Sequence, residues 1–215
     1  MKEGAPEQIE VKTQEEMIAA LKAGKIPVCV TGKFQVTGED FVVARGDAEV
    51  TGKNRCFIEA SEGAAISLRG FARVKATGKV RVHAWDAARV DAAGHAHVQE
   101  EATVHVTAHG ESEIKARGRS VVLAYENASV TVLDHASVKA YDNVHVIAKD
   151  SATAVVHGVA SALLKNKSHA VAWNYAHITA QSESSVIAND YSVVDASDSA
   201  EVTVYGYASV NKEVA

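Results

Sequence analysis

The sequence predicts an all-β fold, a single-stranded parallel β-helix (β-solenoid) built from octapeptide repeats. From Gly32 to Ala215 the chain divides into 23 consecutive units of eight residues without an insertion. In each unit positions one, three and five are mostly small or aliphatic, whereas positions two, four and six are mostly polar. Such alternation predicts a short strand with one buried face, and position seven carries the Gly, Asp, Asn or Glu of a tight corner. Strands of this kind, stacked in parallel, form a solenoid over residues 32–215.

The segment before the repeats, residues 1–31, is expected to cap the solenoid. Residues 9–12 alternate like an edge strand. Thr13 and Glu16 have the spacing of a helix capping box, and Gly24 predicts the end of that helix. Its apolar face comprises Met17, Ile18 and Leu21. A short amphipathic helix placed here would cover the open end of the solenoid, which needs a solvent-compatible terminus.

The number of octads in one coil can be two or three. We prefer three octads, a three-sided, 24-residue coil, because that period places like residues on neighbouring coils. The second position then aligns Ser137, Ser161, Ser185 and Ser209. A flattened, two-sided coil of two octads stays open as the alternative, since the interior is built from small Ala and Val side chains.

Composition narrows the class of protein further. Two Pro and 14 Gly exclude a collagen-like chain, and no apolar run approaches the roughly 18 residues of a membrane span. The first residues lack the apolar core of a signal peptide, so we expect a cytoplasmic protein in which Cys29 and Cys56 are reduced, buried thiols. A net charge of −5 gives no overall attraction to nucleic acid or to an anionic membrane.

The repeat consensus is clearest in residues 128–135, 136–143 and 200–207, which read ASVTVLDH, ASVKAYDN and AEVTVYGY. These units resemble the octapeptide-repeat β-solenoid proteins found among uncharacterised proteins of phages and gut bacteria. More distantly they are similar to bacterial ice-nucleation repeats, whose unit is two octads long. The resemblance covers residues 32–215 and implies a solenoid, with a phage or prophage setting, but supplies no catalytic motif. The chain departs from ice-nucleation repeats because it lacks a regular Thr-x-Thr and a Tyr at every sixteenth residue.

Aliphatic residues at outward positions indicate a partner-binding surface. In the 24-residue coil one side carries Val121, Leu123, Ile147 and Val171, and the adjoining side carries Leu163 and Ile187. Tyr125 and Trp173 lie at nearby corners, and aromatic residues of this kind are enriched at interface hot spots. The competing interpretation is that β-branched residues favour strands whichever way they point.

The candidate ligand sites are weaker. His145 and His169 occupy the same position of adjacent 24-residue coils and could share a metal ion such as Zn²⁺, with Asp195 or His97 along the same face. Exposed histidines on a polar face explain the same pattern, and we expect no resident cofactor. Corner acids could bind Ca²⁺, although turn chemistry explains them equally well. These acids are Glu126, Asp142, Asp150, Asp190 and Asp198.

Enzymatic activity and nucleic-acid binding are not expected. Catalytic β-helices usually build their sites on inserted loops, and the repeats contain none. The segment 65–120 is locally basic, but Arg73, Arg81 and Arg89 are spaced one octad apart and would lie on different sides of a triangular coil.

Two functional hypotheses follow. The first is a non-enzymatic β-solenoid that serves as a rigid scaffold, through self-association as a homo-oligomer or through binding of another protein. The alternative is a small-ligand or metal-binding, transferase-like β-helix that uses its histidine-bearing face. The oligomeric mass and the metal content of the purified protein distinguish them.

Overall fold

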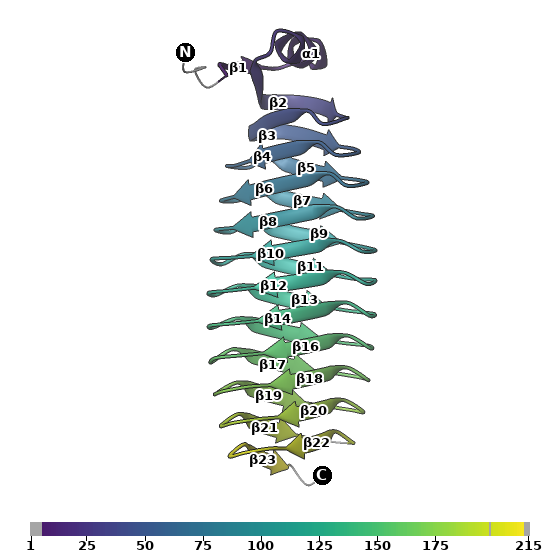
Figure 1. The fold of residues 1–215 in the computed structure, drawn as a ribbon, viewed down its shortest axis with the longest axis vertical. Helices are drawn as coiled ribbons and strands as arrows, with labels where there is room; N and C mark the ends of the chain where they lie inside the picture. The colour runs from purple at the N-terminus through teal and green to yellow at the C-terminus, as the bar shows by residue number, and fades with distance from the viewer. Residues whose placement is uncertain (1–5, 198, 213–215) are drawn as a thin grey trace.

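A computed structural model describes residues 6–197 and 199–212, which form 23 strands and one helix. Figure 1 shows the strands stacked in one straight column, with the helix at the N-terminal end and the C-terminus at the opposite end. The predicted all-β parallel solenoid is therefore confirmed. The helix is neither long enough nor apolar enough to cross a membrane.

The column consists of two sheets, named here by the parity of their strand numbers. The N-terminal elements are β1 (Gln8–Val11), α1 (Gln14–Lys22), β2 (Ile26–Val36) and β3 (Phe41–Gly52), and β2 and β3 are long enough to enter both sheets. The even sheet continues with β4 (Phe57–Ala60), β6 (Arg73–Thr77), β8 (Arg89–Ala93), β10 (His105–Ala108), β12 (Val121–Ala124), β14 (Ser137–Ala140), β16 (Thr153–Val156), β18 (His169–Ala172), β20 (Ser185–Ala188) and β22 (Glu201–Val204). The odd sheet continues with β5 (Ala65–Leu68), β7 (Arg81–Ala84), β9 (His97–Glu100), β11 (Glu113–Ala116), β13 (Ser129–Val132), β15 (His145–Ala148), β17 (Ser161–Leu164), β19 (His177–Ala180), β21 (Val193–Ala196) and β23 (Ser209–Lys212).

Each coil contains two strands, not three. Every strand from β4 to β21 pairs in parallel with the strand two places along the chain, so residues two octads apart stack, as Val122 does on Val138 and Val130 does on Val146. The expected three-sided coil of three octads is therefore wrong, and the two-sided alternative holds. The physical reason is the size of the interior side chains: Ala and Val fill the gap between two facing sheets, but would leave a void along the axis of a triangular coil.

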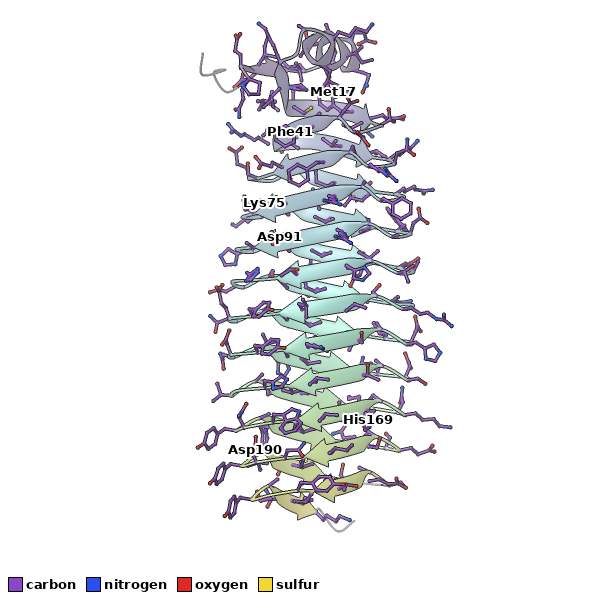
Figure 2. All side chains as sticks on the ribbon, in the orientation of Figure 1. Met17, Phe41, Lys75, Asp91, His169 and Asp190 are labelled. Carbon is purple, nitrogen blue, oxygen red and sulfur yellow. The ribbon has the colours of Figure 1, made fainter. Side chains whose placement is uncertain are left out.

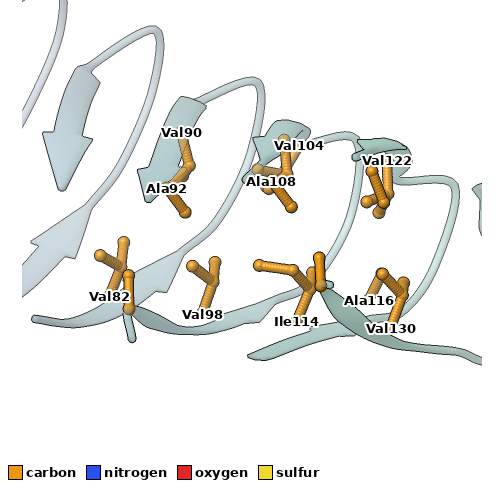
Figure 3. Close-up of a cluster of buried hydrophobic side chains, with 14 of the residues drawn as sticks. Val82, Val90, Ala92, Val98, Val104, Ala108, Ile114, Ala116, Val122 and Val130 are labelled. Carbon is orange, nitrogen blue, oxygen red and sulfur yellow. The ribbon is translucent and has the colours of Figure 1, made fainter. Parts of the chain in front are cut away.

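The core lies between the two sheets. Figure 3 shows Val82 and Val98 of the odd sheet directed toward Val90 and Val122 of the even sheet. All four side chains are at most 3% exposed. Octad positions one, three and five point inward along both sheets, so the alternation in the sequence predicted the buried face correctly.

The corners depend on octad position seven. The residue there has a positive φ, near 60–70° at most corners, whether it is Gly94 or Asn166. A non-glycine residue in this conformation has a steric cost, and among the residues larger than glycine that cost is smallest for Asn and Asp. The corner residues predicted from composition therefore do lie at the corners.

The regular repeat begins inside β2 and β3. Thr31 pairs with Asp47, two full octads later, whereas Cys29 pairs with Ala44, one position short of two octads. The register shift between them marks the point where the octad pattern starts in the sequence. Cys29 and Cys56 are free and buried, and burial raises the pKa of the Cys29 thiol to about 12.

The helix α1 closes the N-terminal end of the column. The predicted capping box is present, because Thr13 accepts a hydrogen bond from the Glu16 backbone N–H and Glu16 accepts one from the Thr13 backbone N–H. Met17 is buried against the first coil (Figure 2), whereas Ile18 is 40% exposed, so its predicted place on the apolar face is wrong. A helix that lies across the end of a narrow two-sheet column has room to bury only part of its apolar stripe.

Candidate interaction surface

The aliphatic residues predicted to share one side are divided between the two sheets. A spacing of three octads is one and a half coils, so it moves a residue from one sheet to the other. Ile147 and Leu163 are register partners on the odd sheet. The even sheet carries Val121, Leu123, Val155, Val171 and Ile187.

The even-sheet residues form the longer apolar column. Val155, Val171 and Ile187 occupy the fourth octad position on the consecutive strands β16, β18 and β20 and are direct register partners. Leu123 lies two strands earlier in the same column, separated from Val155 by Lys139. These aliphatic side chains point outward and stay partly exposed, since neighbours on adjacent strands cover only their flanks.

This column belongs to a surface with almost no charge, which we call the neutral strip. It comprises the outward residues at octad positions two, four and six of the even-sheet strands from β10 to β20, and the structure describes all of them. With histidines neutral, Lys139 is its only charged member. The strip consists of His105, Thr107, His109, Val121, Leu123, Tyr125, Ser137, Lys139, Tyr141, Thr153, Val155, His157, His169, Val171, Trp173, Ser185, Ile187 and Asn189.

One margin of the neutral strip is a stack of aromatic rings, which we call the aromatic ladder. Tyr125 and Tyr141 have ring centroids 5.2 Å apart, Tyr141 and His157 4.9 Å apart, and His157 and Trp173 6.4 Å apart. His109 begins the ladder, 5.1 Å from Tyr125. All interplanar angles are 9° or less. The structure thus brings Tyr125 and Trp173, both singled out in the sequence, into one row.

A second stack lies just beyond the corner. Tyr175, Tyr191 and Tyr207 stack with centroid separations of 5.5 and 5.2 Å, and their exposures are 66%, 53% and 77%. Both stacks follow the period of two octads. The spacings Tyr125 to Tyr141 and Tyr175 to Tyr191 were the sequence signal that could have identified the two-sided coil.

The acidic corner residues link successive coils instead of gathering into a site. Glu126 accepts a hydrogen bond from the Gly110 backbone N–H at 2.8 Å, and Asp142 accepts one from the Glu126 N–H at 3.1 Å. Asp198 lies outside the described residues. The same contact, to the residue one coil earlier, recurs for Asp150 and Asp190. These bonds satisfy a backbone donor in each corner, which gives the carboxylates a structural role without calcium.

The two histidines predicted to stack do not meet. His145 lies on β15 of the odd sheet and His169 on β18 of the even sheet. Each ring nitrogen Nδ1 lies within hydrogen-bonding distance of a serine hydroxyl on the next coil, Ser161 at 2.8 Å and Ser185 at 2.7 Å respectively. The expected shared metal site is wrong for the same reason as the three-sided coil, and no group of three or more metal-ligating side chains occurs in the described part of the chain.

The remaining histidine contacts do not assemble a catalytic chain. His177 Nε2 lies 2.8 Å from Asp195, and Asp195 also accepts a hydrogen bond from Asn211; the Asn211 bond first and then His177 lower the pKa of the Asp195 carboxyl. His97 lies 3.2 Å from Glu113. Within residues 6–197 and 199–212, no histidine is hydrogen-bonded both to a serine hydroxyl and to a carboxylate; His97 contacts the Gln99 amide as well as Glu113.

One buried carboxyl group was missed in the sequence. Glu100 occupies the inward fifth position of β9, is 2% exposed, and neither carboxyl oxygen has a hydrogen-bond partner among the described residues. Burial raises its pKa to about 9, so the carboxyl is protonated at neutral pH. The signal was visible: its octad, AHVQEEAT, is the one repeat whose fifth residue is acidic.

The three arginines that we expected on three different sides of the coil lie on only two sheets. Arg73 and Arg89 are direct register partners on the even sheet, whereas Arg81 lies on the odd sheet. In a two-sided coil every second octad returns to the same sheet. The expected separation of these arginines onto different sides therefore no longer argues against a continuous basic surface.

The fold and these surfaces define the class of protein: a two-sided parallel β-solenoid, with two octads in each coil and a nearly uncharged strip on its even sheet. A comparison of the chain with protein-family models, curated proteins and solved structures found no match.

Proposed function

We propose that this β-solenoid is a rigid, non-enzymatic scaffold that self-associates through its neutral strip, with two copies packed face to face and antiparallel. The observation that carries the proposal is the single charge, Lys139, among the outward residues of the even sheet from β10 to β20. Burying a charged surface costs desolvation energy, and burying this strip avoids nearly all of it. The aliphatic column and the aromatic ladder supply the apolar contact area.

The charges at the two ends of the strip favour an antiparallel pair. A two-fold axis parallel to the strands relates the two copies. It reverses the order of the coils in the second copy, but a residue at the second octad position still faces a residue at the second octad position. With the strips centred on each other, β8 of one copy faces β22 of the other, so Arg89 faces Glu201 at both ends. Neither residue forms an ion pair with another described residue. Lys139 faces the β16 coil, where its aliphatic stem covers Val155.

The size of this surface suits a dimer. Coils spaced by about 4.8 Å give a length of roughly 34 Å from β8 to β22, across seven spacings. A width of about 20 Å, from the strand and its corner residue, then gives roughly 680 Å² per copy. That lies within the range of roughly 600–1,000 Å² per partner of a typical specific interface.

A pair of matched lysine variants tests the proposal. Val155→Lys/Val171→Lys places two like charges on neighbouring coils at the centre of the strip, and we expect this variant to be monomeric while the parent is a dimer in light scattering after size exclusion. The control, Ile147→Lys/Leu163→Lys, makes the same change at the same octad position of the odd sheet and should remain dimeric. Circular dichroism checks that both variants stay folded. A monomeric parent at high concentration, or dissociation of the control as well, would refute the proposal.

Charge reversal tests the orientation of the two copies. Arg89→Glu and Glu201→Arg should each weaken the dimer, because each places like charges opposite one another. The double variant restores opposite charges at both ends and should recover the parent dissociation constant. If the double variant is as weak as the single variants combined, the copies do not pack antiparallel in this register.

A further inference from the structure

The coils near the N-terminal end carry an excess of positive charge. Residues 65–95 contain six Lys or Arg residues and two Asp or Glu residues, in a chain whose net charge is −5. One of the two acids, Asp86, is engaged at a corner, where it accepts a hydrogen bond from the Gly70 backbone N–H at 2.9 Å. The local excess therefore has few internal counter-charges.

Three of these cations lie together on the even sheet. Arg73 and Arg89 are register partners on β6 and β8, about 4.8 Å apart at the backbone, and Lys75 lies at the next outward position of β6. All three are exposed, and none forms an ion pair with another described residue. Lys75 lies between two acidic register partners, Glu59 on β4 and Asp91 on β8, and Figure 2 shows Lys75 and Asp91 on successive coils. Arg73 and Arg89, in contrast, are like charges on adjacent strands, and a bound anion would relieve their repulsion.

The cations line a continuous depression, which we call the basic trough. A hollow of about 500 Å³ runs from Phe57 past Arg73 and Arg89 to Leu123, and a second of about 640 Å³ adjoins it. Both hollows are lined by Phe57, Arg73 and Arg89. From β4 to β12 the trough is about 19 Å long, since it crosses four coil spacings. The proposed dimer covers the end from β8 to β12, so the accessible part is the end at β4 and β6, with the second hollow beside Phe71.

Aromatic side chains and a further arginine lie at the edge of the trough. Phe71 is 63% exposed at a corner beside the second hollow, and Arg55 lies beside it in the same lining. Phe57 stacks on Phe41 with centroids 5.5 Å apart. Glu39 is the acid of this lining, and it lies 3.9 Å from Arg55. Exposed rings beside a row of cations offer stacking surfaces next to phosphate contacts.

We propose that the basic trough binds a single strand of nucleic acid. The backbone phosphates contact Arg73 and Lys75, and a base stacks on Phe71 at the corner. Arg73, Lys75 and Phe71 lie N-terminal to β8, outside the dimer contact proposed above. Substitutions at these three positions therefore test the trough independently of self-association.

Fluorescence anisotropy with a labelled oligonucleotide of about 12 nucleotides tests the phosphate contacts. We expect parent binding to weaken steeply between about 50 and 200 mM salt. Arg73→Gln/Lys75→Gln should lower the slope of log affinity against log salt by about 1.4, because each phosphate contact to a single strand contributes about 0.7. The matched control, Arg81→Gln/Lys115→Gln, removes two charges from the odd sheet and should leave the slope unchanged. No binding by the parent at low salt, or an equal loss in the control, overturns the proposal.

A second pair of measurements separates nucleic acid from phosphate alone. Phe71→Ala should lower affinity for the oligonucleotide at least about fivefold, in line with the loss of one base–aromatic stack. Its affinity for inorganic polyphosphate, measured by competition, should equal that of the parent. If Phe71→Ala binds the oligonucleotide as tightly as the parent, the trough recognises phosphate without bases, and the assignment to nucleic acid is wrong.

Discussion

At the scale of single residues, Glu100 is the strongest exception to the repeat. Its register neighbours are Ala84 and Ala116, so the carboxyl lies in a narrow apolar interior without a counter-charge. The folded state holds its proton up to about pH 9, whereas the unfolded chain releases it near pH 4.5. Between these values the folded state binds more protons, so the free energy of unfolding falls as pH rises.

The variant Glu100→Leu should remove this pH dependence. A leucine already occupies the same inward position in β5 and β17, where Leu68 and Leu164 are fully buried. Each pKa unit corresponds to about 1.4 kcal/mol, so the parent loses about 3 kcal/mol of stability between pH 4.5 and pH 7. Urea unfolding at several pH values should show that loss for the parent and not for Glu100→Leu. The exposed neighbour provides the control: Glu101→Gln should retain the parent slope, and an unchanged slope in Glu100→Leu would refute the assignment.

At the scale of structural elements, the ladders on the surface tie successive coils together. Tyr141 lies between Tyr125 and His157, with centroid separations of 5.2 and 4.9 Å. Each aromatic pair contributes about 0.5–1.5 kcal/mol beyond the area that it buries.

Tyr141→Ala breaks the aromatic ladder at its middle and should lower the free energy of unfolding by about 1–3 kcal/mol. Tyr141→Phe keeps the ring and should cost much less, since the Tyr141 hydroxyl forms no hydrogen bond with another described residue. Chemical denaturation of both variants provides the comparison. Equal losses for Ala and Phe would mean that ring stacking contributes nothing to stability.

At the scale of the whole molecule, the coil of two octads predicts which deletions the fold tolerates. Removing residues 128–143 takes out one complete coil. Each residue next to the deletion then stacks on a residue of the same column, so Tyr125 stacks on His157. Removing residues 128–135 takes out a single strand, so every later residue changes sheet and Tyr125 meets Lys149. The buried face survives in both cases, because all octads share one inward pattern.

The shorter deletion should therefore be the more damaging one. We expect the variant lacking residues 128–143 to melt at a higher temperature than the variant lacking residues 128–135, although it has lost twice as much of the chain. Thermal unfolding followed by circular dichroism makes the measurement. The reverse order would show that the surface columns do not contribute to the choice of register.

The sequence by itself determined the secondary structure and the buried face. An octad with inward Val138 and Ala140 and outward Ser137 and Lys139 can bury only one side of a strand, whatever the shape of the coil. The helix cap at Thr13 and the corners at position seven follow from equally local chemistry.

Only the tertiary structure decided which strands share a sheet. Coils of two or three octads present the same inward pattern, so the alternation cannot distinguish them, and packing of the Ala and Val interior selects two sheets over three. That selection separated Leu123 from Ile147 and His145 from His169, and placed Arg73 on Arg89. The candidate surfaces depend on this pairing because a column of side chains exists only once the coil length is set.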